Sequence, residues 1–139
     1  MSIAHNMVLA ARECLGTPFQ HQGRVPGVGL DCVGVAIYAA REVGLNPVDV
    51  QGYGETPNNG ALRTALNSQP DLESVSLQDM PQEGDILLFR LRKEPQHVGI
   101  CTGTGVIHAY SVVGICCEHD LCTKWLSRIV GIYRVKGLT

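Results

Sequence analysis

One cysteine occupies a position in which a thiol can act as a nucleophile. Cys32 directly follows Asp31, a residue type that caps helices, and begins an apolar segment that continues to residue 43. A thiol in the first turn of a helix lies beside unpaired backbone N–H groups, whose partial positive charge favours the thiolate. The same groups can donate hydrogen bonds to the oxyanion that forms when a carbonyl is attacked. We therefore predict a nucleophile with a lowered pKa at Cys32; the alternative is a buried structural cysteine.

Two histidines are predicted to lie close together in a β-hairpin. His97 begins one predicted strand and His108 lies within the next. A two-residue turn at Gly103-Thr104 pairs position 97 with position 110, so that His108 becomes a diagonal neighbour of His97 on the same face. One imidazole can then take the proton of Cys32 while the other orients the first. A different turn would break this geometry, and a structural role for each histidine is the alternative.

The remaining cysteines favour a reduced protein without a metal. Four possible zinc ligands crowd into seven positions, at Cys116, Cys117, His119 and Cys122. No second ligand pair follows at the usual spacing, although Cys14 and Cys101 stand elsewhere in the chain. Neighbouring residues of a strand point to opposite faces, which separates such ligands. We expect no metal site, no cofactor, reduced thiols, and His119 at the surface.

The elements that must position these residues fall into two halves. Helical spacing and caps predict helices over 2–15, 32–43 and 61–67, separated by loops over 19–30 and 45–59. Short β-branched segments predict strands over 84–91, 97–101, 106–110, 113–118 and 129–135, with a helical turn near 121–126. Helices followed by strands indicate an α+β fold, with the N-terminal helices packed on an antiparallel sheet of about five strands. A chain of 139 residues is expected to form a single domain, residues 1–139.

Composition excludes two classes of partner. Charged residues make up 17% of the chain, the formal net charge is -2, and no basic run is longer than Arg92-Lys93. A nucleic-acid-binding protein normally carries a basic stripe, so nucleic acid is not expected as a partner. No apolar segment reaches the roughly 20 residues that span a membrane, so membrane insertion is not expected. The N-terminus lacks the features of a signal peptide, so we expect synthesis in the cytoplasm.

Several motifs together resemble the NlpC family of cell-wall cysteine peptidases. They follow one another between about residues 15 and 133: Gly16-Thr-Pro-Phe19, Gly29-Leu-Asp-Cys-Val-Gly34, Gly84-Asp-Ile-Leu-Leu-Phe89, His97-Val-Gly-Ile100 and Ile107-His-Ala109. The resemblance implies a minimal version of the papain-like fold and a catalytic triad of Cys32, His97 and His108. It also implies hydrolysis of peptidoglycan stem peptides, commonly between D-glutamate and a diamino acid. Loop 19–29 is similar to the branch encoded with phage tails and gene-transfer particles, which implies phage tail proteins as partners and a location in the virion.

Two residues depart from the pattern of that family. Val33 stands where the family often has serine, and Phe19 stands where many members have a tyrosine whose hydroxyl assists the nucleophile or the oxyanion. Phenylalanine cannot donate that hydrogen bond, and His21, Gln22 or Tyr53 are the candidates to replace it. The alternatives to a peptidoglycan peptidase are therefore a structural tail or adaptor protein with a degenerate peptidase fold, and a papain-like amidase or acyltransferase with another substrate.

Overall fold

The computed structural model describes residues 2–50, 52–53, 60–91 and 95–137. Its helices are α1 (Ile3–Arg12), α2 (Cys32–Glu42), α3 (Ala61–Asn67) and α4 (Thr123–Leu126). Each corresponds to a predicted helix or helical turn, and α3 has the predicted bounds. The predicted loop 45–59 contains no helix or strand at 45–50 and 52–53, and its other positions lie outside the described residues.

The strands form one large sheet and one small one. The large sheet contains β3 (Leu72–Val75), β4 (Ile86–Arg90), β5 (Pro95–Cys101), β6 (Gly105–Tyr110), β7 (Ile115–Asp120) and β8 (Ile129–Val135). Their order is β3-β8-β4-β5-β6-β7, and every neighbouring pair is antiparallel. The predicted α+β fold with an antiparallel sheet is therefore confirmed.

Two strand pairings were missed by the sequence analysis. The edge strand β3 is a sixth strand, and its sequence Leu-Glu-Ser-Val shows little of the apolar alternation that predicts a strand. The predicted loop 19–30 contains the short antiparallel pair β1 (Arg24–Val25) and β2 (Gly29–Leu30). Pairs of two residues are too short to produce a periodic signal.

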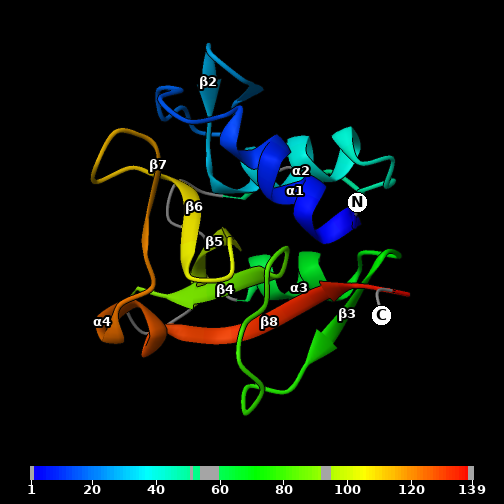
Figure 1. Cartoon of the computed structure of the whole chain (residues 1–139). Helices are drawn as coiled ribbons and strands as arrows, with labels where there is room; N and C mark the ends of the chain where they lie inside the picture. Colours follow the sequence, from blue (N-terminus) through cyan, green and yellow to red (C-terminus); the bar gives the residue numbers. More distant parts are fainter. Residues whose placement is uncertain (1, 51, 54–59, 92–94, 138–139) are drawn as a thin grey trace.

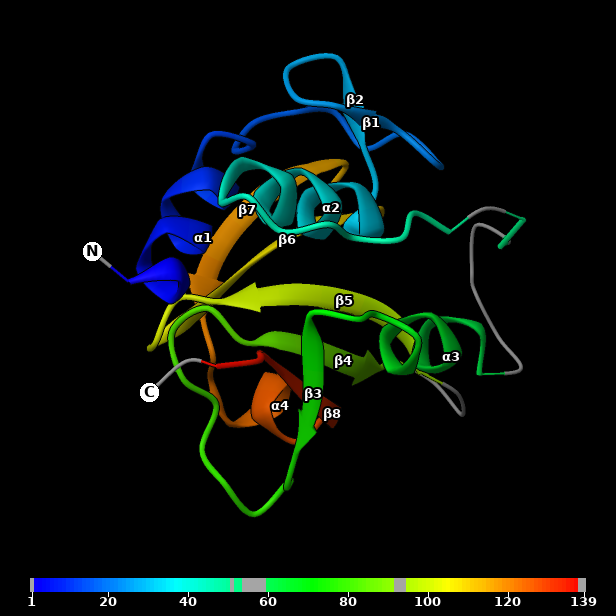
Figure 2. The same cartoon turned by 90° about the vertical axis from the view of Figure 1, so that its right-hand side faces the viewer.

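The sheet lies between two layers of helix, as Figures 1 and 2 show. Helices α1 and α2 lie side by side over one face, and α4 lies on the other side of the sheet. Alternate residues of the strands therefore enter two apolar clusters. Ile86, Leu88 and Val98 pack toward α1 and α2, whereas Leu87 and Phe89 pack on the side of α4.

The helix that begins at Cys32 is defined at both ends by local chemistry. Asp31 is its N-cap, and the Asp31 Oδ1 atom accepts a hydrogen bond from the Gly34 N–H at 2.8 Å. The helix ends before Gly44, whose φ of +85° lies in the left-handed region that glycine adopts at low cost. No helix of the described residues is long and apolar enough to cross a membrane.

Candidate active site

The Cys32 thiol lies where two strands of the sheet separate. The ladder between β5 and β6 consists of the pairs Ile100↔Ile107 and Cys101↔Val106. Beyond this short ladder, toward the start of β5, the backbone N–H of Val98 lies near the Cys32 sulfur and lowers the pKa of the thiol. The N-terminus of α2 therefore brings the thiol to the backbone of Val98, the residue that follows His97 in β5.

Burial outweighs the helix N-terminus in setting the pKa of Cys32. Desolvation of the enclosed thiol, followed by the charge of the Asp31 carboxylate, raises the pKa of Cys32 to about 12. The N–H groups of Val98, Val33 and Cys32 itself lower it, but by less. The prediction of a lowered pKa is therefore wrong, because the free-energy penalty of removing water from the thiolate exceeds the stabilisation that nearby amide dipoles give it. At rest the sulfur is a thiol that needs a base.

The two predicted histidines do meet. The Thr102 N–H donates to the Gly105 carbonyl at 2.9 Å, which closes the predicted two-residue turn. Nε2 of His97 lies 2.5 Å from Nδ1 of His108, and the ring centroids are 4.7 Å apart. The predicted register and shared face are thus confirmed.

Both imidazoles are kept neutral by burial. His97 is 4% exposed and His108 is fully buried. Desolvation lowers the pKa of His108 to about 3, with a smaller contribution from His119. Desolvation, followed by the neighbouring histidines, also lowers the pKa of His97 well below its ordinary value. A neutral His97 whose Nε2 is engaged by His108 has only Nδ1 left to accept a proton from the thiol.

A third histidine, which the sequence analysis placed at the surface, lies against this pair. Nε2 of His119 is 2.8 Å from Nε2 of His108, and Nδ1 of His119 is 2.9 Å from the Asp120 carbonyl oxygen. In the register of β6 and β7, His119 is opposite Val106, which makes it a diagonal neighbour of His108. The rule that predicted the first contact would have found this one, had the turn between β6 and β7 been recognised.

Aromatic rings cover the three histidines on the side of α4. The centroid of Trp125 lies 5.1 Å from that of His108 and 5.1 Å from that of His119. Tyr110 stacks on His108 at 5.4 Å with an interplanar angle of 16°. This cover keeps the inner rings dry and limits their rotation.

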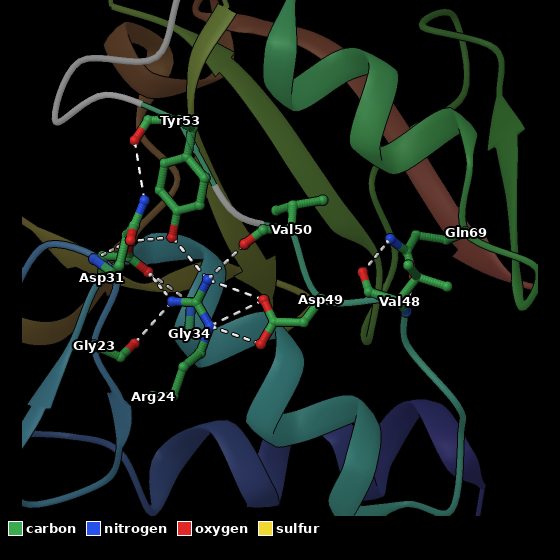
Figure 3. Close-up of polar contacts among 10 residues, drawn as sticks. Gly23, Arg24, Asp31, Gly34, Val48, Asp49, Val50, Tyr53 and Gln69 are labelled. Atoms are coloured by element: carbon green, nitrogen blue, oxygen red, sulfur yellow. Dashed lines mark hydrogen bonds and ion pairs between the residues drawn. The ribbon is translucent and has the colours of Figure 1, made fainter.

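A polar network holds the N-terminus of α2 in place (Figure 3). The Asp31 carboxylate accepts hydrogen bonds from the Tyr53 hydroxyl at 2.5 Å, from Arg24 at 2.9 Å and from the Gln22 N–H at 2.8 Å. Arg24 also binds Asp49 through its Nε and Nη2 atoms. The sequence analysis missed Arg24 and Asp49, which are 25 positions apart and belong to no local pattern.

A close approach of backbone to backbone locks the same region. A Cβ atom on Gly34 would lie 2.2 Å from the Gly23 carbonyl oxygen, a distance that no side chain tolerates. Loop 20–23 therefore packs directly on the first turn of α2, beside Cys32.

The proposed substitutes for the missing tyrosine hydroxyl have defined positions. The Tyr53 hydroxyl donates to Asp31 and accepts from Arg24, so it supports the helix cap. The Gln22 side-chain amide donates to the Tyr53 carbonyl oxygen at 3.2 Å, and His21 packs edge-on against the Tyr53 ring. Phe19 is half-buried and packs against the main apolar cluster. The side chain of Val33 is buried, while its N–H lies at the thiol.

The cysteine-rich segment is split between the faces of β7. Cys116 is buried in the main apolar cluster, whereas Cys117 is half-buried and Cys122 is exposed. Within the described residues, no three His, Cys, Asp or Glu side chains are arranged to hold a metal ion.

Comparison with known proteins identifies a family that this sequence matches. The sequence model of the NlpC/P60 family matches residues 16–134. A search of the curated proteins finds no match.

Solved structures share the fold. The NlpC/p60 domain of the peptidoglycan hydrolase SagA is 22% identical with a TM-score of 0.65; the alignment covers 95% of this chain and 98% of that one. An NlpC/P60 family protein from Bacillus cereus is 20% identical with a TM-score of 0.69, over 95% of this chain and 40% of that one. The peptidoglycan hydrolase RipB from Mycobacterium tuberculosis is 17% identical with a TM-score of 0.67, over 95% and 64%. This chain thus spans less than two thirds of the latter two proteins.

Proposed function

The chain belongs to the NlpC/P60 family, and from this premise we propose that it is a cysteine peptidase of peptidoglycan, with Cys32 as the nucleophile and His97 as its base. The observation that supports the proposal best is the hydrogen bond of 2.5 Å between His97 and His108, with the thiol of Cys32 near the backbone N–H of Val98, the residue next to His97. Two solved structures with the same fold are described as peptidoglycan hydrolases.

The reaction begins from a neutral pair. Nδ1 of His97 takes the thiol proton as the sulfur of Cys32 attacks the carbonyl carbon of the substrate. The N–H groups of Cys32 and Val33 lie at the sulfur and can donate to the oxyanion that forms. The imidazolium of His97 then protonates the leaving amine, and a water molecule, activated by the same ring, hydrolyses the thioester. His108 accepts a hydrogen bond from Nε2 of His97 and stabilises the imidazolium.

The substrate follows from the family and not from the triad, because a Cys-His-His triad does not select among amides. We propose the peptidoglycan stem peptide, cleaved between D-glutamate and the diamino acid. Association with a phage tail or gene-transfer particle stays a prediction that rests on loop 19–29 alone.

Digestion of purified peptidoglycan with analysis of the fragments by mass spectrometry tests the function. We expect Cys32→Ala and His97→Ala each to lower the rate at least about 10³-fold, since nucleophile and base act as one unit. His108→Ala should lower it less, because it removes only the orienting partner. Cys122→Ala, at an exposed cysteine, is the matched control and should leave the rate unchanged.

Two results would replace the proposal. If the unmutated protein cleaves no peptidoglycan but hydrolyses an activated ester through Cys32, the chain is a papain-like amidase or acyltransferase with another substrate. If it does neither, the structural tail or adaptor function should take its place, and the loss of the hydroxyl at Phe19 would be its physical basis.

A further inference from the structure

The contacts of His119 define where its proton lies. Its Nδ1 atom faces the Asp120 carbonyl oxygen at 2.9 Å. A carbonyl oxygen accepts hydrogen bonds and cannot donate them, so Nδ1 must carry the proton. In a neutral imidazole only one nitrogen is protonated, and Nε2 of His119 is therefore an acceptor.

The tautomer of His119 sets the direction of the hydrogen bonds between His119 and His108 and between His108 and His97. Because Nε2 of His119 accepts, the bond of 2.8 Å is donated by Nε2 of His108. The unprotonated Nδ1 of His108 then accepts from Nε2 of His97 at 2.5 Å. Nδ1 of His97 is left with its lone pair, which is the state that a base for the Cys32 thiol requires.

Burial makes this dependence strong. His108 is fully buried, and Trp125 lies against both His108 and His119. An N–H of His108 that lost its acceptor would be left unpaired in a dry environment, which is unfavourable. The alternative tautomer of His108 would avoid that cost, but it would donate from Nδ1 and force Nε2 of His97 to become the acceptor. His97 would then carry its proton on Nδ1 and could not act as a base.

We propose that His119 is a positioning residue, which holds His108 and His97 in the tautomers that leave Nδ1 of His97 free for the thiol proton. The proposal rests on the function assigned above to Cys32 and His97. His119 acts through His108 and touches no substrate. The carbonyl oxygen of Asp120 thereby orients the base through three consecutive imidazole rings.

The tautomers can be observed without any substrate. Two-bond ¹H–¹⁵N correlation spectra of the full chain, labelled at histidine and recorded above the titration range of the rings, report which nitrogen carries the proton. We expect Nε2–H at His97 and His108 and Nδ1–H at His119. A protonated Nδ1 on His97 or His108 in the unmutated protein would overturn the proposal.

Two substitutions separate the acceptor from the packing. His119→Phe keeps a ring against Trp125 but removes the acceptor, and His119→Gln keeps an acceptor oxygen without the ring. In His119→Phe we expect a mixture of tautomers at His108, and a decrease of about 10-fold in kcat for peptidoglycan fragments with KM unchanged. In His119→Gln the tautomers should be retained and kcat should recover to within about 3-fold.

The outcomes distinguish the possible failures. Equal loss of kcat in both variants, with unchanged tautomers in His119→Phe, would show that His119 serves packing alone. A wild-type protein that cleaves nothing would defeat the proposed function, while its spectra would still decide the tautomers. If His119→Phe does not fold, the spectra of the wild type and of His119→Gln carry the test.

Discussion

Burial of two imidazoles gives the active site a measurable dependence on pH. His108 has a pKa of about 3 in the folded protein, against about 6.5 for an exposed histidine, and the pKa of His97 is lowered in the same direction. Below about pH 6.5 the unfolded chain therefore binds protons that the folded protein does not. The stability associated with these rings is complete above about pH 6.5 and declines as the pH falls toward the folded pKa.

We expect His108→Gln to weaken the acid destabilisation of the protein. The substitution removes one buried group that must stay neutral, and each such group contributes about 1.4 kcal/mol per pH unit in the window below about 6.5. Chemical denaturation at a series of pH values between about 3 and 6.5 measures how steeply the free energy of unfolding falls with pH. His5→Gln is the control, because the His5 side chain bonds to Glu83 and is 40% exposed. An unchanged slope in His108→Gln would mean that His108 is protonated in the fold.

At the scale of elements, the first turn of α2 depends on segments that lie far from it in sequence. Asp31 caps the helix and is itself held by Arg24 and by the hydroxyl of Tyr53. Hydrogen bonds to charged groups contribute more to stability than neutral ones, about 1.5–3 kcal/mol. Residues 20–30, together with Asp49, Val50 and Tyr53, thus determine where the thiol of Cys32 lies (Figure 3).

Tyr53→Phe tests whether this hydroxyl supports the helix or the oxyanion. We expect a loss of about 1–3 kcal/mol of stability, because Asp31 and Arg24 both lose a partner, with a moderate decrease in activity. Denaturation and steady-state kinetics on the same samples give both quantities. Tyr38→Phe is the control: it removes an exposed hydroxyl that bonds to Glu13 from α2 itself, and it should change stability and activity little. A decrease in kcat of about 100-fold or more at unchanged stability would instead assign Tyr53 to the oxyanion.

At the scale of the whole molecule, the sheet joins two apolar clusters that lie on its two faces. Met7 of α1 is fully buried in one cluster, whereas Trp125 of α4 packs against the other. The strands contribute alternate residues to both, so that the two faces share one backbone. We propose that residues 1–139 unfold as a single cooperative domain.

Met7→Ala provides the test, since Trp125 is the only tryptophan of the chain. We expect a loss of about 2–5 kcal/mol, and an equal shift of the unfolding transition whether it is followed by Trp125 fluorescence or by far-UV circular dichroism. Leu9→Ala, on the same helix with Leu9 40% exposed, should cost much less. A fluorescence transition that stays in place while the dichroism shifts would show that the two faces unfold separately.

Features governed by local rules could be predicted from the sequence. The cap at Asp31, the apolar run behind it and the turn at Gly103-Thr104 involve residues close together in the chain. Helix capping and the two-residue period of a strand act over such distances, and they were enough to bring His97 and His108 together. The antiparallel α+β fold followed from the order of the elements.

Other features exist only once distant segments have packed. The acceptor for His108 comes from β7 and its cover from α4, and the partners of Asp31 come from two loops. The pKa of Cys32 was predicted with the wrong sign because a position in a helix indicates nearby amides, whereas the loss of water depends on every segment that encloses the thiol. The sequence by itself determined which residues do the chemistry we propose; burial and long-range contacts, which no local pattern encodes, decided their protonation and orientation.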